Sequence, residues 1–371
     1  MIAAHPYTAA VVAPTTTFGG RTPAPIALPV LDAGPQRPVY AQGPRSLASV
    51  RLLRLSVTDR CNLRCAYCMP EGGMQFADRD ELLRPADFEA VARTALELGI
   101  ESLKITGGEP TVRGDLLEIV RRLAALGPRD LSLTSNGMQL RRLAAPLRDA
   151  GVRRLTLSLD SLDAERFEAI TGGGRLEVFQ EGLDAAIAAG FERLKLNMVV
   201  VRGFNDDEVE AMAALSIDRP WTIRFIEYMP LGESRLTIGE RSGWTPEEAI
   251  YDNALVMQRL RDRFGGLEPV ERSSEAGVGP AHVFRLPGAA GRVGFISAMS
   301  RPFCETCNRL RLTATGQLRS CLFDGGEVDV LPALRPALDP RDLARRFAAC
   351  VALKPEVHSS RGNRAMSQIG G

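Results

Sequence analysis

The chain has 371 residues, and 45% of them are hydrophobic, enough to bury the core of one large domain or two ordinary ones. Its 46 Lys and Arg against 45 Asp and Glu leave a formal net charge of +1, which argues against a protein-wide attraction for nucleic acid or an anionic membrane. The sequence has no apolar run of about 18 residues and no basic region of a secretory signal, so we expect a cytoplasmic protein with no membrane span.

The first 48 residues have the composition of an unfolded segment. They are rich in Ala, Pro, Thr and Gly, contain one acid, Asp32, and show no sustained hydrophobic period of 2 or 3.6 residues. Residues 1–48 therefore predict a disordered N-terminal extension.

From Arg51 onward, short β-type runs alternate with longer amphipathic runs. The predicted strands are Arg51–Val57, Ser102–Thr106, Leu131–Thr134, Arg154–Leu159, Leu194–Val200 and Thr222–Tyr228. The predicted helices include Pro85–Leu98, Gly114–Leu126, Leu140–Ala150 and Leu176–Ala189. A glycine, the usual residue beyond a helix C-terminus, follows each of these helices. The pattern predicts an α/β fold with parallel strands and right-handed crossovers.

Six β/α units are visible, whereas a closed (β/α)8 barrel has eight. We therefore expect a partial, open (β/α)6 barrel of the TIM type over residues 49–230. Residues 231–371 change pattern and predict a second domain of the α+β type that covers the open side. Its predicted elements are a helix near Pro246–Phe264 and β-type pieces around His282–Leu286, Val293–Ile296, Leu310–Thr313 and Leu318–Ser320.

The first cysteine group follows the first predicted strand, at the end where barrels keep their chemistry. Cys61, Cys65 and Cys68 have the spacing C-x3-C-x2-C. In a reducing cytosol such a group favours metal or cluster binding over disulfides. Three thiolates leave one iron of a [4Fe–4S] cube open to a small molecule with amino and carboxylate groups. A structural zinc loop is the alternative, but no His or Cys lies between Cys68 and His282 to complete it.

The second cysteine group is again a set of three: Cys304, Cys307 and Cys321. The alternative to a second cluster is a zinc ribbon whose fourth ligand is Cys350, His282 or His358.

Two arginines beside the second cysteine group favour the cluster. Arg309 and Arg311 alternate in a β-type stretch, so both side chains project to the same face. Bidentate guanidinium groups beside an open iron suit an anionic or purine-like substrate.

The motifs taken together resemble a known family. The first cysteine loop has an aromatic residue before its last Cys, and T-G-G-E-P at Thr106–Pro110 follows the second strand, as in the radical SAM superfamily. With C-E-T-C-N-R-L-R-L, the R-S-C-L-F after it and the final M-S-Q-I-G-G, the chain resembles the GTP 3′,8-cyclase family from about Leu52 to Gly371.

This resemblance implies a lyase that uses two [4Fe–4S] clusters and S-adenosyl-L-methionine (SAM). The reaction would convert GTP to 3′,8-cyclo-7,8-dihydro-GTP, the first step of molybdenum cofactor biosynthesis. Implied partners are GTP, an electron donor of the flavodoxin or ferredoxin type and a downstream cyclic pyranopterin monophosphate synthase. A homodimer is compatible with the resemblance.

The resemblance also assigns residues. It places a cluster with SAM at Cys61, Cys65 and Cys68, and a cluster with substrate at Cys304, Cys307 and Cys321. The implied SAM contacts are Tyr67, Gly108, Ser158 and Met229. The implied GTP contacts are Arg54, Lys104, Thr134, Lys195, Arg309, Leu310 and Arg311. Catalytic roles fall to Arg309, Arg311, Gly370 and Gly371, the two glycines forming a thin tail that would enter the active site.

Three of the implied GTP contacts, Arg54, Lys104 and Lys195, alternate with core residues along predicted strands, so we expect them to point into the barrel. A cation there is costly unless an anion compensates it, which is the physical reason to expect a triphosphate. The alternative is pairing with barrel carboxylates such as Glu227 or Asp160.

Two other functions stay open at this point. One is a radical SAM peptide-modifying enzyme with auxiliary clusters, although such proteins usually bring more cysteines than the four after residue 300. The other is a zinc-stabilised binding protein. Balanced charge and the lack of interleaved aromatic residues argue against a nucleic-acid module of that kind.

Overall fold

The structure, a computed structural model, describes residues 45–69, 73–231, 236–238, 241–270, 279–323, 326–358 and 366–369. The chain divides into two compact units, Met1–Pro38 and Val39–Gly371, and every described residue belongs to the second. Residues 1–44 of the predicted N-terminal extension lie outside the described residues. The end of that predicted extension contributes to a short 3-10 turn, Leu47–Ser49.

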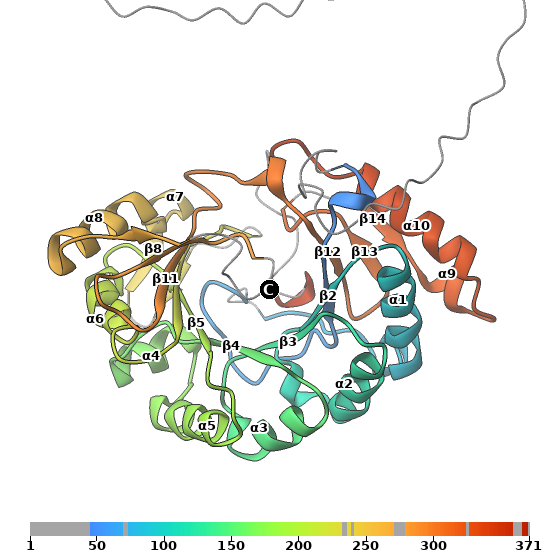
Figure 1. Ribbon diagram of the computed structural model, residues 1–371, viewed down its shortest axis with the longest axis horizontal. Helices are drawn as coiled ribbons and strands as arrows, with labels where there is room; N and C mark the ends of the chain where they lie inside the picture. Colours follow the sequence, from blue (N-terminus) through green and yellow to red (C-terminus); the bar gives the residue numbers. More distant parts are fainter. Residues whose placement is uncertain are drawn as a thin grey trace, which may run out of the picture. The chain divides into compact units, whose positions relative to one another are not determined.

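Among the described residues, twelve strands form one mixed sheet. Its central strands run parallel and neighbour one another in chain order: β1 (Leu52–Ser56), β2 (Ser102–Thr106), β3 (Asp130–Ser135), β4 (Arg154–Ser158), β5 (Lys195–Val200) and β6 (Thr222–Glu227). The helices between them are α1 (Pro85–Glu97), α2 (Leu116–Ala125), α3 (Leu140–Asp149), α4 (Ala164–Thr171), α5 (Leu176–Ala188) and α6 (Val209–Ala214). These helices lie outside the curved sheet (Figure 1). The predicted α/β class is therefore confirmed.

The later part of the chain extends this sheet at both edges. Beyond β6 lie β11 (Arg292–Ile296), β10 (His282–Arg285) and β9 (Glu268–Pro269). Beyond β1 lie β12 (Arg309–Leu312), β13 (Gln317–Arg319) and β14 (Glu327–Asp329). Strands β11 and β12 are parallel to the central strands that they pair with, and the outer strands are antiparallel. A separate pair comprises β7 (Leu236–Ile238) and β8 (Arg241–Trp244).

The helices of the later part are α7 (Pro246–Ala249), α8 (Asn253–Phe264), α9 (Leu331–Leu334), α10 (Pro340–Ala352) and α11 (Met366–Ile369). The single helix predicted near Pro246–Phe264 is two helices. The physical reason is Asp252, whose extended backbone interrupts the helix and whose carboxylate accepts the Ala254 N–H at the start of α8.

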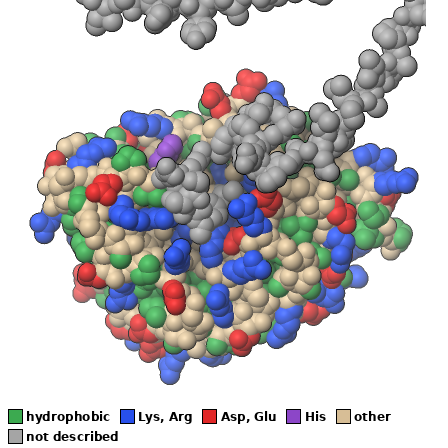
Figure 2. Space-filling model, viewed as in Figure 1, with side chains coloured by type: hydrophobic (Ala, Val, Ile, Leu, Met, Phe, Trp, Pro, Cys, Tyr) green, Lys and Arg blue, Asp and Glu red, His purple; other side chains and the backbone are tan. Residues whose placement is uncertain are grey.

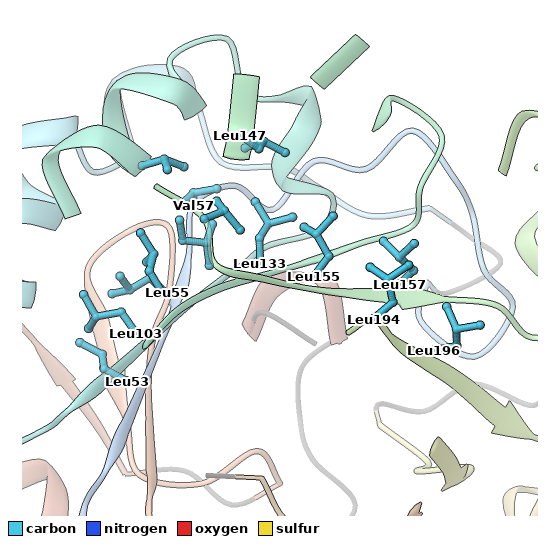
Figure 3. Packing of buried hydrophobic residues seen from close by; sticks show 14 of the residues in the cluster. Leu53, Leu55, Val57, Leu103, Leu133, Leu147, Leu155, Leu157, Leu194 and Leu196 are labelled. Atoms are coloured by element: carbon cyan, nitrogen blue, oxygen red, sulfur yellow. The ribbon is translucent and has the colours of Figure 1, made fainter. Parts of the chain in front are cut away.

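The core lies between the sheet and the outer helices. Leu53 and Leu55 of β1 and Leu103 of β2 are fully buried there, and Figure 3 shows such leucines side by side along the strands. Side chains alternate along a strand, so the residues between these leucines face the inner side of the sheet. Basic and acidic side chains are interspersed on the face that Figure 2 shows, in keeping with the near-zero net charge. None of the helices in the described ranges is long and apolar enough to cross a membrane.

Candidate active site

Both cysteine groups line one cavity of about 310 Å3 on the inner side of the sheet. The six sulfur-bearing residues are Cys61, Cys65, Cys68, Cys304, Cys307 and Cys321. None of the seven cysteines forms a disulfide. In the described residues, no three His, Cys, Asp or Glu side chains are arranged to hold a single metal ion. The fit to a cluster therefore rests on the donor chemistry, which is two sets of three half-buried thiols facing one space.

The first cysteine loop packs main chain against main chain on the Gly-Gly segment after β2. Gly108 N–H donates to Thr58 O at 2.7 Å, and Glu109 N–H donates to Arg60 O at 2.8 Å. A Cβ on Gly108 would lie only 2.4 Å from Arg60 O. Glycine lets a neighbouring backbone approach closely because it has no side chain. Here the cysteine loop occupies the space of the missing side chains.

A buried tyrosine–aspartate pair fastens the same loop to the next strands. The Tyr67 hydroxyl donates to Asp160 Oδ2 at 2.8 Å, and the Val199 N–H donates to Asp160 Oδ1 at 2.8 Å. Burial raises the pKa of Asp160 to about 6. The sequence offers Asp160 as a partner for barrel cations; the contacts described for it hold Tyr67 and the Val199 main chain.

Burial also changes the pKa values of thiols in this loop. It raises the pKa of Cys61, and it raises the pKa of Cys65 well above the ordinary range, with Cys68 and Asp160 adding negative charge nearby. The loop by itself therefore favours the neutral thiol, and a metal would have to supply the compensating positive charge.

A band of cations lines the same cavity as the two cysteine groups. Among the described residues, the Lys and Arg side chains that line the cavity are Arg54, Lys104, Arg154, Lys195, Arg224, Arg309 and Arg311. Five of them were predicted from the sequence, and Arg154 and Arg224 were not. The signal for Arg224 was present, because it alternates with the core residues Ile223 and Phe225 in β6.

These cations share partners and repel one another. Lys104 Nζ and Arg224 Nη2 lie 3.1 and 3.3 Å from the same Thr156 Oγ1. Burial, followed by the charges of Arg224, Arg54 and two further cations, holds the pKa of Lys104 well below its ordinary value. An ion pair with Asp130 compensates Arg154.

The second cysteine group forms a tight turn just before β12. Cys304–Thr306 is a 3-10 turn, and Cys307 N–H donates to Cys304 O at 3.0 Å. Arg309 Nη2 lies 3.8 Å from Cys307 Sγ, and its guanidinium stacks over the Phe303 ring at 4.9 Å. Burial raises the pKa of Cys307, but Arg309 and Lys354 lower it by more, to about 6. Cys307, unlike Cys61 and Cys65, therefore favours the thiolate that ligates metal.

The predicted substrate residues on β12 face opposite sides of the sheet. Arg309 and Arg311 line the cavity, whereas Leu310 is fully buried in the hydrophobic core opposite Leu53 of β1. The side chain of Leu310 therefore does not face the cavity, because alternation along a strand sends it to the other side.

The remaining predicted residues divide into two sets. The predicted SAM contacts and Thr134 all line the cavity: Tyr67, Gly108, Thr134, Ser158 and Met229. Gly370 and Gly371 lie outside the described residues. The carbonyl of Ile369, the last described residue, accepts a hydrogen bond from Arg311 Nη1 at 3.4 Å.

The three candidate fourth ligands for zinc lie in different places. Cys350 is buried in the core, and burial raises its pKa to about 12. His282 is in β10, toward the other edge of the sheet. His358 lines the cavity, where its Nε2 lies 2.9 Å from Ala298 O and its ring stacks on Phe323 at 4.2 Å.

Glu227, the other carboxylate considered for the barrel cations, is fully buried at the end of β6. It accepts main-chain N–H groups from Asn253, Met299 and Ser300. Its carboxylate thus holds the loop that leads to Cys304.

Comparisons with known proteins agree with this geometry. The family model "Radical SAM superfamily" matches residues 55–215, and the model "Molybdenum Cofactor Synthesis C" matches residues 221–360. The chain is 47% identical over 327 residues to the GTP 3',8-cyclase of Pelotomaculum thermopropionicum, with 87% of this chain and 98% of that one covered. Against the enzyme of the same name from Geobacter sulfurreducens it is 45% identical over 329 residues, covering 87% and 97%.

A solved structure, that of Streptococcus suis SuiB bound to S-adenosylmethionine, shares the fold. The TM-score is 0.52 at 14% sequence identity, and the match covers 76% of this chain and 64% of that one.

Proposed function

Because this chain belongs to the GTP 3′,8-cyclase family of the radical SAM superfamily, we propose that SAM binds at its first cysteine group and GTP at its second. The reaction is the conversion of GTP to 3′,8-cyclo-7,8-dihydro-GTP in molybdenum cofactor biosynthesis, and we assign it to the lyases. Support comes from one observation: both cysteine groups and the cation band line the same cavity.

In this proposal each cysteine group holds a [4Fe–4S] cluster through three thiolates, which leaves one iron open. When bound, the first cluster and SAM supply one-electron chemistry that generates an organic radical. Tyr67 and Asp160 keep the first cysteine loop in place, and Gly108, Ser158 and Met229 are the proposed SAM contacts.

The cation band is the proposed triphosphate site. Lys104, Lys195 and Arg224 lie on β2, β5 and β6, and together with Arg54 they favour a multiply charged anion over a neutral ligand. The hydroxyl of Thr134 offers one further hydrogen bond. Fixing this end of GTP restricts where its ribose can lie, which is the contribution of positioning to the rate.

Arg309 and Arg311 are the proposed contacts of the guanine end, beside the open iron of the second cluster. Gly370 and Gly371, whose catalytic role stays a prediction, follow Ile369 in the sequence, and the Ile369 carbonyl accepts a hydrogen bond from Arg311. Aromatic side chains at Phe303 and Phe323 line the same end of the cavity and would exclude water.

We interpret the curved sheet as an open (β/α)6 barrel over residues 49–230, with residues 231–371 as the substrate domain. We further propose a cytoplasmic location, an electron donor of the flavodoxin or ferredoxin type, and a downstream cyclic pyranopterin monophosphate synthase. A homodimer is compatible with these partners.

Metal analysis separates this proposal from its alternatives. Protein purified without oxygen should contain about eight irons per chain, with matching sulfide. Stoichiometric zinc at the second group would contradict the two-cluster proposal and favour a zinc-stabilised second domain instead.

The activity has its own test. Reduced protein with SAM and GTP should form 5′-deoxyadenosine in step with the loss of GTP. Equal deoxyadenosine without GTP would contradict GTP as the substrate. Arg309→Ala or Arg311→Ala should keep both clusters and lose cyclisation; loss of the second cluster would instead mean that these arginines are structural.

A further inference from the structure

Lys354 lies directly after α10, and its side chain ends at the second cysteine group. The side chain is buried, with only 2% of the residue exposed. Its Nζ lies 3.4 Å from Cys307 Sγ, 3.2 Å from Cys307 O and 2.8 Å from Arg309 O. An ammonium group has three N–H donors. All three are therefore used on residues 307–309.

Such a buried ammonium needs negative charge nearby to be stable. Its three acceptors are two carbonyl oxygens and one sulfur, and none of them is a carboxylate. The Lys354 N–H donates to Val351 O at the C-terminal end of α10, where the helix dipole supplies partial negative charge. Of the three acceptors, the sulfur is the one that can carry a full negative charge, as a thiolate or as a cluster ligand.

Lysine is rare in this chain, so its use at position 354 instead of arginine is informative about the contacts made there. Of the 46 Lys and Arg residues, three are lysines: Lys104, Lys195 and Lys354. Lys104 and Lys195 line the cavity, and Lys354 contacts one of its cysteines. Arginine occupies every other basic position. The ammonium is a compact point charge with tetrahedral donors, whereas the guanidinium is a planar fork. The three-way contact of Lys354 requires the compact group.

Cys61 of the first group and Cys307 of the second differ in the donors that reach their sulfurs. At Cys61 Sγ the donors are the Leu63 N–H at 3.4 Å and the Asn136 side-chain amide at 3.9 Å, and both are neutral. At Cys307 Sγ the donors are Lys354 and Arg309, and both are charged. Charge and hydrogen bonds at ligand sulfurs are among the factors that tune cluster potentials.

We propose that Lys354 is a positioning residue that raises the reduction potential of the second cluster by holding a positive charge and an N–H donor against Cys307 Sγ. This rests on the proposed function, in which Cys307 is a cluster ligand. Reduction adds negative charge to a cluster, so a fixed cation at its ligand favours the reduced form. Within the described residues the hydrogen-bond donors at Cys61 Sγ are neutral, and Arg64 acts on it only through its charge. Two clusters with the same number of thiolates would therefore differ in potential.

The test is a redox titration of the complete two-cluster protein, followed by electron paramagnetic resonance. The first cluster's signal is the one that SAM perturbs, and the second cluster's signal is the one that GTP perturbs. Lys354→Met should disfavour reduction of the second cluster about tenfold, a downward shift of about 59 mV for a one-electron couple, and leave the first cluster unchanged.

Two further variants test whether the change in potential comes from the charge at position 354. Lys354→Arg keeps the charge and should stay closer to the wild-type potential than Lys354→Met. Arg346→Met is the matched control, because it removes a cation from α10, the helix that precedes Lys354. The partners of Arg346 are the Asp342 carboxylate and Asp329 O, not a cysteine. This variant should leave both potentials unchanged.

An unchanged potential in Lys354→Met, with the second cluster intact, would overturn the proposal. If Lys354→Met loses the second cluster, Lys354→Gln is the deciding variant, because it keeps an N–H donor without the charge. A lowered reduction potential of the second cluster in Lys354→Gln supports the proposal, and an unchanged potential overturns it. Loss of the cluster from all three variants, including Arg, would also overturn it, by making Lys354 a folding requirement of the loop. Wild-type protein with only one cluster would instead refute the proposed function.

Discussion

Lys104 illustrates how the cavity favours an anion before any ligand is bound. Its pKa is lowered first by burial and then by Arg224 and Arg54. Those neighbours are themselves affected: burial and then Arg311 lower the pKa of Arg54 well below its ordinary value. A bound polyanion would reverse these effects, since it supplies opposite charge at short range.

GTP binding should therefore be linked to proton uptake. The pKa of Lys104 is lowered in the ligand-free protein and raised again in the complex, so GTP binds the protonated form more tightly. Affinity should be highest below the ligand-free pKa of Lys104 and fall as the pH rises through it. Isothermal titration calorimetry in two buffers of different ionisation enthalpy, from about pH 7 to about pH 9, measures the uptake. Lys104→Met should abolish most of it; equal uptake in that variant would assign the proton to another group.

At Thr134, a substitution should weaken GTP binding without lowering protein stability. The Thr134 Oγ1 is buried, and no hydrogen-bond partner for it occurs within the described ranges. A buried hydroxyl without a partner costs about 1–3 kcal/mol, so Thr134→Val should leave the free energy of unfolding unchanged or higher. Loss of one hydrogen bond to GTP should weaken binding about tenfold, or about 1.4 kcal/mol.

Urea unfolding and GTP titration of the same Thr134→Val protein provide the two measurements. Thr156→Val is the control, because the Thr156 hydroxyl already has partners in Lys104 and Arg224 and its removal should lower stability. Wild-type GTP affinity in Thr134→Val would contradict the assignment.

At the scale of elements, local signals predicted the β/α units well. Strand Ser102–Thr106 has its predicted bounds, and α1 ends one residue before its predicted end, ahead of Gly99. The hydrophobic alternation also placed Arg54 on the cavity side correctly. These features depend on residues that are close in the sequence, which is why the sequence is sufficient for them.

Pairings between strands that are far apart in the sequence could not be predicted from local sequence patterns. Strand β12 pairs with β1, so Arg311 lies beside Arg54 although 257 positions separate them in the numbering. The sequence placed Arg309 and Arg311 on one face but could not indicate which strand they would join. Lys354 was missed for the same reason, because it follows a helix in a polar stretch and acquires its role only through contact with Cys307.

Glu227 joins three elements and should matter for stability. Its buried carboxylate accepts N–H groups from the start of α8 and from the loop before Cys304. Glu227→Gln retains one acceptor oxygen and should lower the free energy of unfolding by about 2–4 kcal/mol, since hydrogen bonds to a charged group contribute about 1.5–3 kcal/mol each. Denaturant unfolding tests the stability, and hydrogen exchange at residues 299–303 tests the loop.

The matched control for Glu227→Gln is Glu248→Gln, an exposed carboxylate that caps α7 through the Thr245 N–H. It should change stability little. Equal effects of the two variants would show that Glu227 is no more important than a surface cap.

At the scale of the whole described unit, the core and the cysteine groups are separate. Leucines between the sheet and the outer helices form the core, and of the seven cysteines only Cys350 belongs to it (Figure 3). The six proposed cluster ligands lie instead on loops and strand ends facing the cavity.

Removal of iron should therefore leave the fold largely intact. After anaerobic chelation, the far-UV circular dichroism should stay close to that of the loaded protein, while binding of SAM and GTP is lost. This differs from small zinc domains, in which metal binding supplies the folding free energy. A large loss of helical signal on chelation would mean that the clusters hold the sheet together.

Because lysine is scarce, reagents that acylate amines should modify this protein at very few side chains. Lys104 and Lys195 are half-buried and line the cavity, and Lys354 is buried beside it. Apart from the α-amino group, an amine-acylating reagent therefore has no side-chain target on the outer surface. Acylation of lysine side chains, measured by mass spectrometry, would report the interior of the active site alone, and GTP should shield Lys104 and Lys195 from the reagent.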